Sequence, residues 1–214
     1  MPNLTTGFAG FIGSHVYHAL GGGDGLERDD VLQKKKYDTI FHLGFDASIP
    51  KSFDNPRESH LNNVGRTIEI LQLARETGAK VVFSSSSAIY DLKSPYSLEK
   101  YICEQYMDFY WKTWGVKSVA LRYFNVFGEG QENANGGYAL ALSKFLKQHR
   151  DGEPFTIVGT GEQRRDFVYV KDVVRANLQA SEWLDTATES RVFDVGTGQN
   201  FSINEVCDMI DGTH

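Results

Sequence analysis

The sequence predicts an α/β fold, a doubly wound parallel sheet with a small second lobe. Short, continuously apolar runs, which suit strands buried on both faces, alternate with longer runs of helical period. A glycine-rich turn follows the first apolar run and precedes the first helical one. Strand, helix and strand in succession form right-handed βαβ units, which require a parallel sheet covered by helices on both faces.

The elements of the sheet follow one another over the first 125 residues. We expect strands at residues 4–6, 39–43, 80–83 and 118–122. We expect helices from the glycine turn to about Leu20, from Val64 to Thr77 and from Tyr96 to Trp114. Gly78 and Gly115 end the last two helices, because glycine readily takes the left-handed conformation that closes a helix.

The pattern is less regular after Asn125. We expect a helix from Gly136 to His149, short strands at 155–158 and 167–170, a helix from Asp172 to about Leu184, and a late strand at 192–195. The irregular stretch predicts a small lobe over the carboxyl ends of the strands, where α/β proteins bind their ligands.

The glycine turn spans residues 7–15 (GFAGFIGSH). Gly7 allows a tight turn, Gly10 lets backbone N–H groups approach a pyrophosphate, and Gly13 permits close packing of helix on strand. The spacing is GxxGxxG rather than GxGxxG, and three glycines alone are a weak signal. Their place between a strand and a helix nevertheless favours a Rossmann-like site for a dinucleotide.

One part of such a site is missing from the pattern. An acidic residue usually ends the second strand and binds the ribose hydroxyls. Here the first helix breaks at residues 21–23 (GGG), and Asp24 precedes any second apolar run. We therefore expect neither a second nor a third strand between Leu20 and Lys36. Weak cofactor binding and poor discrimination between NAD and NADP follow from that expectation.

A serine-rich strand end and a tyrosine–lysine pair predict catalysis. Residues 83–90 (FSSSSAIY) end a strand in four serines, and residues 96–100 (YSLEK) open the next helix. Tyr96 and Lys100 share a helix face, because they are four residues apart. An ammonium beside a phenol lowers the pKa of the phenol and makes it a usable base. YxxxK is common by chance, but its place after the serines and the glycine turn favours a catalytic role.

Further motifs occur at residues 41–43 (FHL), 62–64 (NNV), 121–125 (LRYFN) and 161–167 (GEQRRDF). Together with the glycine turn, the serines and the YxxxK pair, they resemble the extended short-chain dehydrogenase/reductase family over almost the whole chain. Within that family the resemblance is to nucleotide-sugar epimerases of the UDP-glucose 4-epimerase type, apparently shortened. It implies residues 1–124 with 166–195 as the dinucleotide-binding domain, and residues 125–165 with 196–214 as a truncated substrate-binding lobe.

The resemblance also implies roles for individual residues. The catalytic trio is Ser86, Tyr96 and Lys100. The residues expected to bind NAD are Gly7, Gly10, Phe11, Ile12, Gly13, Asp24, Leu43, Asn62, Ser84, Tyr96, Lys100 and Tyr123. The substrate is expected to contact Ser86, Tyr96, Asn125 and Arg165. The guanidinium fork of Arg165 suits paired hydrogen bonds to a diphosphate, the alternative being a salt bridge with Asp166 or Glu162.

Two small residues, Ser87 and Ala88, narrow the choice of reaction within the family. Dehydratases and decarboxylases of the family carry carboxylates at the positions of Ser87 and Ala88, which have no such proton-transfer group. Epimerisation through a transient keto-sugar is therefore the leading hypothesis. An NADPH-dependent nucleotide-sugar reductase and a truncated, non-catalytic dinucleotide-binding module are the alternatives. The sequence leaves the sugar, the nucleotide base and the inverted carbon open.

Composition excludes several other classes. The net charge is −6 and Lys34–Lys36 is the only dense basic run, so nucleic acid is not an expected partner. Cys103 and Cys207 lack the spacing of a metal site or disulfide framework, which predicts a cytoplasmic protein without a metal. No apolar run is long enough to cross a membrane. The resemblance implies a homodimer through helices 62–77 and 96–114, supported by an excess of apolar surface at Tyr106, Phe109, Tyr110 and Trp114.

Overall fold

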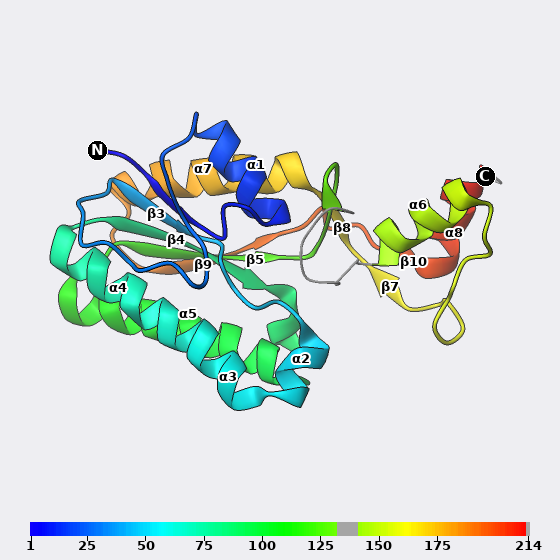
Figure 1. Ribbon diagram of the computed structural model, residues 1–214, viewed down its shortest axis with the longest axis horizontal. Coiled ribbons are helices and arrows are strands. Elements are labelled where there is room, and N and C mark those ends of the chain that lie inside the picture. Colours follow the sequence, from blue (N-terminus) through cyan, green and yellow to red (C-terminus); the bar gives the residue numbers. More distant parts are fainter. Residues whose placement is uncertain (132–140, 213–214) are drawn as a thin grey trace.

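The computed structural model describes residues 1–131 and 141–212 (Figure 1). Its centre is a parallel sheet of six strands in the order β2-β1-β3-β4-β5-β9. The strands are β1 (Leu4–Thr6), β2 (Asp24–Leu26), β3 (Thr39–His42), β4 (Lys80–Ser86), β5 (Ser118–Tyr123) and β9 (Arg191–Val195). The predicted α/β fold with a doubly wound parallel sheet is confirmed.

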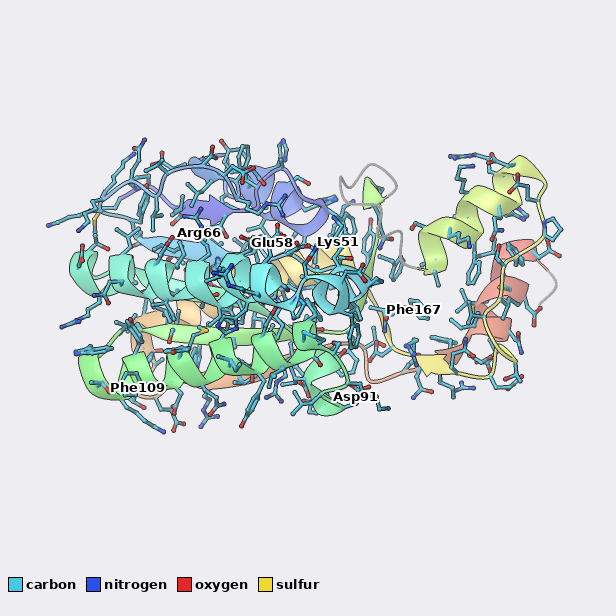
Figure 2. All side chains as sticks on the ribbon, turned by 60° about the horizontal axis from the view of Figure 1, so that its bottom comes forward. Lys51, Glu58, Arg66, Asp91, Phe109 and Phe167 are labelled. Atoms are coloured by element: carbon cyan, nitrogen blue, oxygen red, sulfur yellow. The ribbon has the colours of Figure 1, made fainter. Side chains whose placement is uncertain are left out.

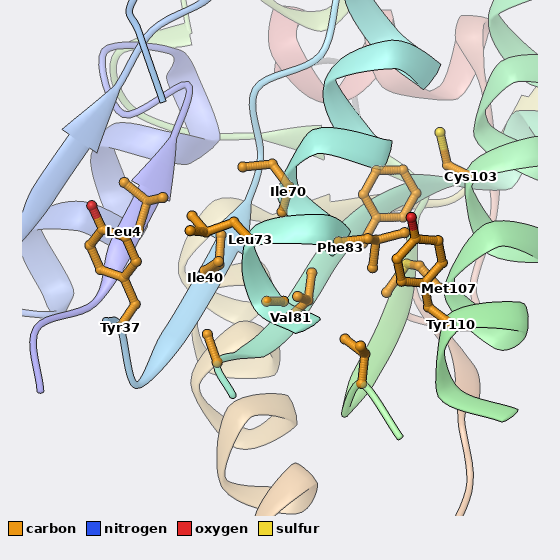
Figure 3. Packing of buried hydrophobic residues seen from close by; sticks show 14 of the residues in the cluster. Leu4, Tyr37, Ile40, Ile70, Leu73, Val81, Phe83, Cys103, Met107 and Tyr110 are labelled. Atoms are coloured by element: carbon orange, nitrogen blue, oxygen red, sulfur yellow. The ribbon is translucent and has the colours of Figure 1, made fainter. Parts of the chain in front are cut away.

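Helices cover both faces of the sheet. In Figure 1, α1 (Phe11–Ala19) and α7 (Val170–Thr186) lie on one face, and α4 (Arg66–Thr77) and α5 (Pro95–Trp114) lie on the other. Successive strand residues point to opposite faces, so each strand contributes to two cores. Ile40, Val81 and Phe83 pack with residues of α4 and α5 such as Ile70 and Met107 (Figure 3). The alternate residues Phe41 and Val82 pack with Val16 and the valines of α7.

The helix ends follow from local sequence. A capping box starts α5: the Ser94 hydroxyl accepts the backbone N–H of Ser97, and the Ser97 hydroxyl accepts the backbone N–H of Ser94. Pro95 occupies the first helical position. Gly78 and Gly115 have φ of 78° and 68°, and they close α4 and α5 as expected. Before α4 the chain forms α2 (Ile49–Asp54), α3 (Pro56–His60) and a π-helical turn, η1 (Leu61–Gly65).

The expectation that no strand lies between Leu20 and Lys36 is wrong. β2 pairs in parallel with β1, Leu4 opposite Asp24 and Thr6 opposite Leu26. This strand is an edge strand of three residues, and only Leu26 is fully buried. A strand with one buried side chain has no apolar run, so hydrophobic pattern alone does not reveal it. Residues 27–38 contain no strand and lead directly to β3.

The small lobe lies beyond one end of the sheet (Figure 1). It contains α6 (Ala141–Asp151), α8 (Ile203–Asp211), and the antiparallel pair β7 (Arg164–Arg165) and β10 (Phe201–Ser202). Its core gathers Phe145, Ile203 and Cys207, and Phe155 and Ile157 pack against them. The parallel pair β6 (Asn125–Phe127) and β8 (Phe167–Tyr169) joins the lobe to the sheet.

Two expectations for the lobe are changed. Residues 155–158 are not a strand: two of their apolar side chains fill the lobe core from an irregular segment, while Val158 is 80% exposed. The expected helix from Gly136 to His149 corresponds to α6, which runs to Asp151; its expected first turn, 136–140, lies outside the described residues. Within residues 1–131 and 141–212, no helix is long and apolar enough to cross a membrane.

Candidate functional site

A cleft of about 1400 Å³ opens at the carboxyl ends of the sheet strands. Its walls include Thr6 at the end of β1, Leu43 after β3, Ser84–Ser86 at the end of β4, and Tyr123 at the end of β5. Arg164 and Arg165 border it from the small lobe. Strand order reverses at β1, because β2 lies on one side of β1 and β3 on the other. Ligands of open α/β sheets bind at such a switch point.

The glycine turn forms one wall of this cleft. Gly7 has a φ of 65°, and a Cβ there would lie 2.6 Å from the Cα of Gly44. A Cβ on Gly13 would lie 1.9 Å from the carbonyl oxygen of Gly7. Both positions therefore require glycine. The first residues of α1, Phe11 and Ile12, also line the cleft, so the positive end of the helix dipole faces it.

The end of β2 supplies an acid that the sequence analysis missed. Glu27 follows β2 directly, lines the cleft, and accepts the N–H of Ala9 at 2.8 Å through Oε1. Asp24 lies at the opposite end of β2 and is not among the residues that line the cleft. Its carboxylate is 2.8 Å from the Nζ of Lys35, and that hydrogen bond lowers its pKa. The structure therefore places Asp24 outside this cleft, and Glu27 stands at the end of the second strand, where the sequence predicted no acid.

Lys100 is buried below the catalytic end of the cleft and is only 3% exposed. Its Nζ donates to the carbonyl oxygen of Ser84 and lies 3.5 Å from the Ser84 Oγ. The ring centroid of Phe45 is 3.6 Å from Nζ, and that of Tyr96 is 5.8 Å away. Burial lowers the pKa of Lys100 to about 7. Tyr96, in the first turn of α5, is half-buried and lines the cleft, so the structure brings the predicted pair together.

The four serines divide into two pairs. Ser84 and Ser85 are buried, and they donate to the carbonyl oxygen of His42 and to the carboxylate of Glu104. Ser86 and Ser87 are half-buried and line the cleft. The Ser86 Oγ accepts the N–H of Ala88 at 3.2 Å, which caps the short 3₁₀ helix η2 (Ser87–Tyr90). Ser86 therefore lines the same cleft as Tyr96 and Lys100, and its hydroxyl is held by the turn that follows β4.

The remaining predicted cofactor residues lie in the same cleft. Leu43 and Asn62 are half-buried in its wall. Tyr123 also borders it, but its hydroxyl bonds to Asn177 at 3.0 Å. Burial raises the pKa of Tyr123 far above its ordinary value, so this phenol stays neutral.

The predicted substrate residues border the cleft on the lobe side. The Asn125 Nδ2 donates to the carbonyl oxygen of Asp166 at 2.9 Å. Arg165 is exposed and donates to the Arg164 carbonyl oxygen at 2.8 Å. Among the described residues it forms neither of the alternative salt bridges: Asp166 accepts N–H groups of Thr197 and Gly198, and Glu162 accepts Asn204.

Two further residues in the cleft wall, Arg164 and Tyr90, belong to the motifs at 161–167 and 83–90 but were assigned no role from the sequence. Arg164 pairs with Glu205 at 3.0 Å and donates to the Asn200 side chain at 2.6 Å, which holds β7 against β10. Tyr90 donates to Asp194 at 2.7 Å and accepts from Arg122 at 3.0 Å. These contacts join segments far apart in the chain, so no local motif predicts them.

Comparisons with known proteins agree with this geometry. The family model described as "NAD dependent epimerase/dehydratase family" matches residues 22–196. A putative UDP-glucose 4-epimerase of Methanocaldococcus jannaschii is 31% identical, over 97% of this chain and 80% of its own length. A UDP-N-acetylglucosamine 4-epimerase of Methanobrevibacter ruminantium, solved with UDP-N-acetylmuramic acid, is 30% identical over 99% of this chain and 81% of its own, with a TM-score of 0.88.

A UDP-glucose 4-epimerase of Thermotoga maritima, solved with UDP-glucose, superposes with a TM-score of 0.85 at 29% identity, over 99% of this chain and 82% of its own. The sheet, the glycine turn, and the serine, tyrosine and lysine at one end of the cleft are thus accompanied by a family match over most of the sequence. The chain belongs to the NAD-dependent epimerase/dehydratase family.

Proposed function

We propose that this protein interconverts two UDP-sugars that differ in configuration at C4, by way of a transient keto-sugar and with NAD as cofactor. The observation that carries the proposal is the meeting of Ser86, Tyr96 and Lys100 at one end of a cleft whose other wall is the glycine turn. The relatives named above as 4-epimerases support both the nucleotide and the carbon.

The residues of the cleft fit a dinucleotide. Gly7, Gly13 and Gly44 leave out side chains where a Cβ would collide with backbone, so the main chain itself forms the floor of the cleft. The N-terminus of α1 suits the pyrophosphate, and Glu27 suits the ribose hydroxyls as acceptor. Bound NAD would supply the hydride acceptor and donor that inversion at a sugar carbon requires.

Within this site we assign proton transfer to the Tyr96 hydroxyl. The Lys100 ammonium stabilises a phenolate, because opposite charges attract more strongly in a buried site than in water. The Ser86 hydroxyl orients the same sugar oxygen. We assign the diphosphate to Asn125 and Arg165, whose guanidinium is not committed to a carboxylate within the described residues.

The test is turnover with a defined pair of sugars. With UDP-glucose and catalytic NAD, proton NMR should show the anomeric signal of UDP-galactose growing in, without net NADH. Tyr96→Phe should lower turnover about a hundredfold or more while NAD affinity stays within about twofold. Tyr101→Phe is the matched control, since Tyr101 is an exposed tyrosine on the same helix. Wild-type turnover in Tyr96→Phe contradicts the mechanism. Net NADPH consumption identifies a reductase, and a 4-keto-6-deoxy product a dehydratase.

We also propose a homodimer built on α4 and α5. Phe109 is 50% exposed near the end of α5 (Figure 2), and Trp114 and Tyr101 are also exposed. Of the other residues expected on this surface, Tyr110 is buried and Tyr106 is partly buried in the monomer core, so the apolar excess is smaller than the sequence suggested. Light scattering that shows a strict monomer at micromolar concentration would exclude this assembly.

We keep the proposed division into a dinucleotide-binding domain and a substrate-binding lobe, and we propose the cytoplasm as location. Both cysteines, Cys103 and Cys207, are free thiols in the structure, which suits a reducing compartment. The division is supported by separate hydrophobic cores, one on each face of the sheet and a third inside the lobe.

A further inference from the structure

Glu99 is a buried carboxylate directly before Lys100 in the sequence. It is 3% exposed, and among the described residues it forms no ion pair. Its Oε2 atom accepts the Ser59 hydroxyl at 2.9 Å and the Asn63 amide at 2.8 Å. Glu104, the other buried carboxylate of α5, pairs with Arg122 at 2.8 Å. Since burying a charge without a cation is costly, the position of Glu99 requires an explanation.

Asn63 connects this carboxylate to the wall of the cleft. Its Nδ2 donates to Glu99, and its Oδ1 accepts the backbone N–H of Asp46 at 2.7 Å. The Nδ2 also lies 3.3 Å from the Asp46 carbonyl oxygen. A carboxylate only accepts hydrogen bonds, so Glu99 holds the amide with its NH₂ inward and its oxygen toward Asp46. A rotated amide would set two donors against each other at Asp46.

The segment held in this way, residues 44–48, lines the cleft. At its start, Gly44 packs against the glycine turn so closely that a Cβ on Gly44 would lie 2.9 Å from the Gly7 nitrogen. Its next residue, Phe45, covers the Lys100 ammonium at 3.6 Å. A shift of this segment therefore changes the dinucleotide side of the cleft and the surroundings of Lys100 together.

We propose that Glu99 is a positioning residue for this cleft: through Asn63 it fixes the segment 44–48 against the glycine turn, and its negative charge acts on Lys100. The inference rests on the proposed function only in giving Lys100 a part in the reaction. Its tests measure NAD affinity and lysine titration, neither of which needs turnover, so they remain decisive if the chain does not epimerise the sugars tried.

The electrostatic part has a definite sign. Burial is the largest influence on the pKa of Lys100 and lowers it; Cys103, Glu104 and Glu99 on the same helix raise it. From β3, His42 also faces this group, and burial lowers its pKa to about 3, so it is neutral. Tyr96 is the remaining titratable group beside Nζ. Removing the charge of Glu99 removes an attraction that favours the ammonium, so the pKa of Lys100 must fall further.

Calorimetric titration with NAD tests the positioning role. Glu99→Ala removes the acceptor and frees the Asn63 amide, so affinity should fall about tenfold. Glu99→Gln can place its amide oxygen at the Oε2 position and keep both bonds, so affinity should stay within about threefold. Ser59→Ala removes a donor to the same oxygen but leaves the link through Asn63. Glu58→Gln is the surface control, because Glu58 is an exposed carboxylate of α3 (Figure 2). Both variants should bind NAD as the wild type does.

Wild-type affinity in Glu99→Ala overturns the positioning role, and so do equal losses in Glu99→Ala and Glu99→Gln. Should Glu99→Ala not fold, the charge is tested in Glu99→Gln alone. NMR of ¹³Cε- and ¹⁵Nζ-labelled lysine follows the Lys100 titration, and Lys100→Met assigns its signal. Glu99→Gln should lower that pKa, while Glu58→Gln leaves it unchanged. An unchanged pKa in Glu99→Gln overturns the electrostatic role.

Discussion

The two ends of the cleft are built differently. The β4 end, with Ser86, Tyr96 and Lys100, rests on buried groups that bond to one another, such as Ser85 with Glu104 and Ser84 with Lys100. The β2 end, with Glu27, Arg28, Asp46 and Arg66, is held by a three-residue edge strand and by more exposed contacts, for example Arg28 with Asp46 at 3.5 Å. Buried polar networks are rigid because each broken bond leaves an unsatisfied group.

This difference matches the roles proposed for the two ends, proton transfer at the β4 end and ribose binding at the β2 end. Proton transfer depends on atoms placed within hydrogen-bond reach, and small misplacements are costly. Binding of a ribose tolerates more adjustment. We therefore expect substitutions at the β4 end to change stability and chemistry strongly, and substitutions at the β2 end to change mainly affinity and cofactor choice.

The largest expected effect is at the β4 end, where the buried carboxylate of Glu104 pairs with the partly buried Arg122. Glu104→Ala removes the carboxylate that accepts from the Arg122 guanidinium and from the Ser85 hydroxyl, and among the described residues leaves Arg122 only its bond to the Tyr90 hydroxyl. Breaking a buried pair from one side costs about 3–5 kcal/mol in free energy of unfolding. Urea denaturation measures it, with Asp108→Ala as control, because Asp108 makes an exposed pair with Lys112 on the same helix. A loss below about 1 kcal/mol would show that this end is no more rigid than the surface.

Lys100 gives the β4 end a pH dependence. Its pKa in the folded protein is about 7, below the ordinary value of 10.5, so the folded state releases this proton first as pH rises. Between these values the unfolded chain binds more protons, and the free energy of unfolding must increase with pH over this window. Lys100→Met should remove that increase when stability is followed by denaturation from pH 7 to 10.

The ammonium is lost above about pH 7, so kcat/KM should fall there in the wild type. A wild-type profile that rises through pH 8 contradicts this.

At the β2 end, substitutions of Glu27 and of Asp24 test which of these two acids determines NAD affinity. Glu27→Ala removes the acceptor at the end of β2, and NAD affinity should fall about tenfold, as for one lost charged hydrogen bond. Discrimination against NADP should also weaken, because the carboxylate opposes a 2′-phosphate. This replaces the expectation of weak binding and poor discrimination, which assumed that no acid ends the second strand. Calorimetry measures the affinities of the wild type and of Glu27→Ala for both cofactors. Equal affinities of the wild type for NAD and NADP would restore the expectation of poor discrimination.

The sequence predicted the sheet, the helix ends and the shared cleft of Ser86, Tyr96 and Lys100 because each has a local signature. Apolar runs mark the strands, Gly78 and Gly115 mark helix ends, and a four-residue spacing places Tyr96 and Lys100 on one face. β2 was not predicted because an edge strand with one buried residue has no hydrophobic period. The Glu99–Asn63–Asp46 link was not predicted for another reason. Glu99 and Asn63 are 36 residues apart, Asn63 and Asp46 are 17 apart, and only the fold brings them together.

The smallest expected effect concerns Asp24 itself. Its ion pair with Lys35 is partly exposed, and such pairs contribute about 0–1 kcal/mol to the free energy of unfolding. Lys35 lowers the pKa of Asp24, so the contribution is present above the ordinary value near 3.8 and is lost as pH falls through the lowered one. Asp24→Asn should therefore leave NAD affinity within about twofold and reduce stability slightly at neutral pH, and the reduction should shrink as pH falls below 3.8. Because β2 directs Asp24 away from the cleft and Glu27 toward it, a tenfold loss of NAD affinity in Asp24→Asn would mean that the strand, not merely the side chain, is placed differently in the bound state.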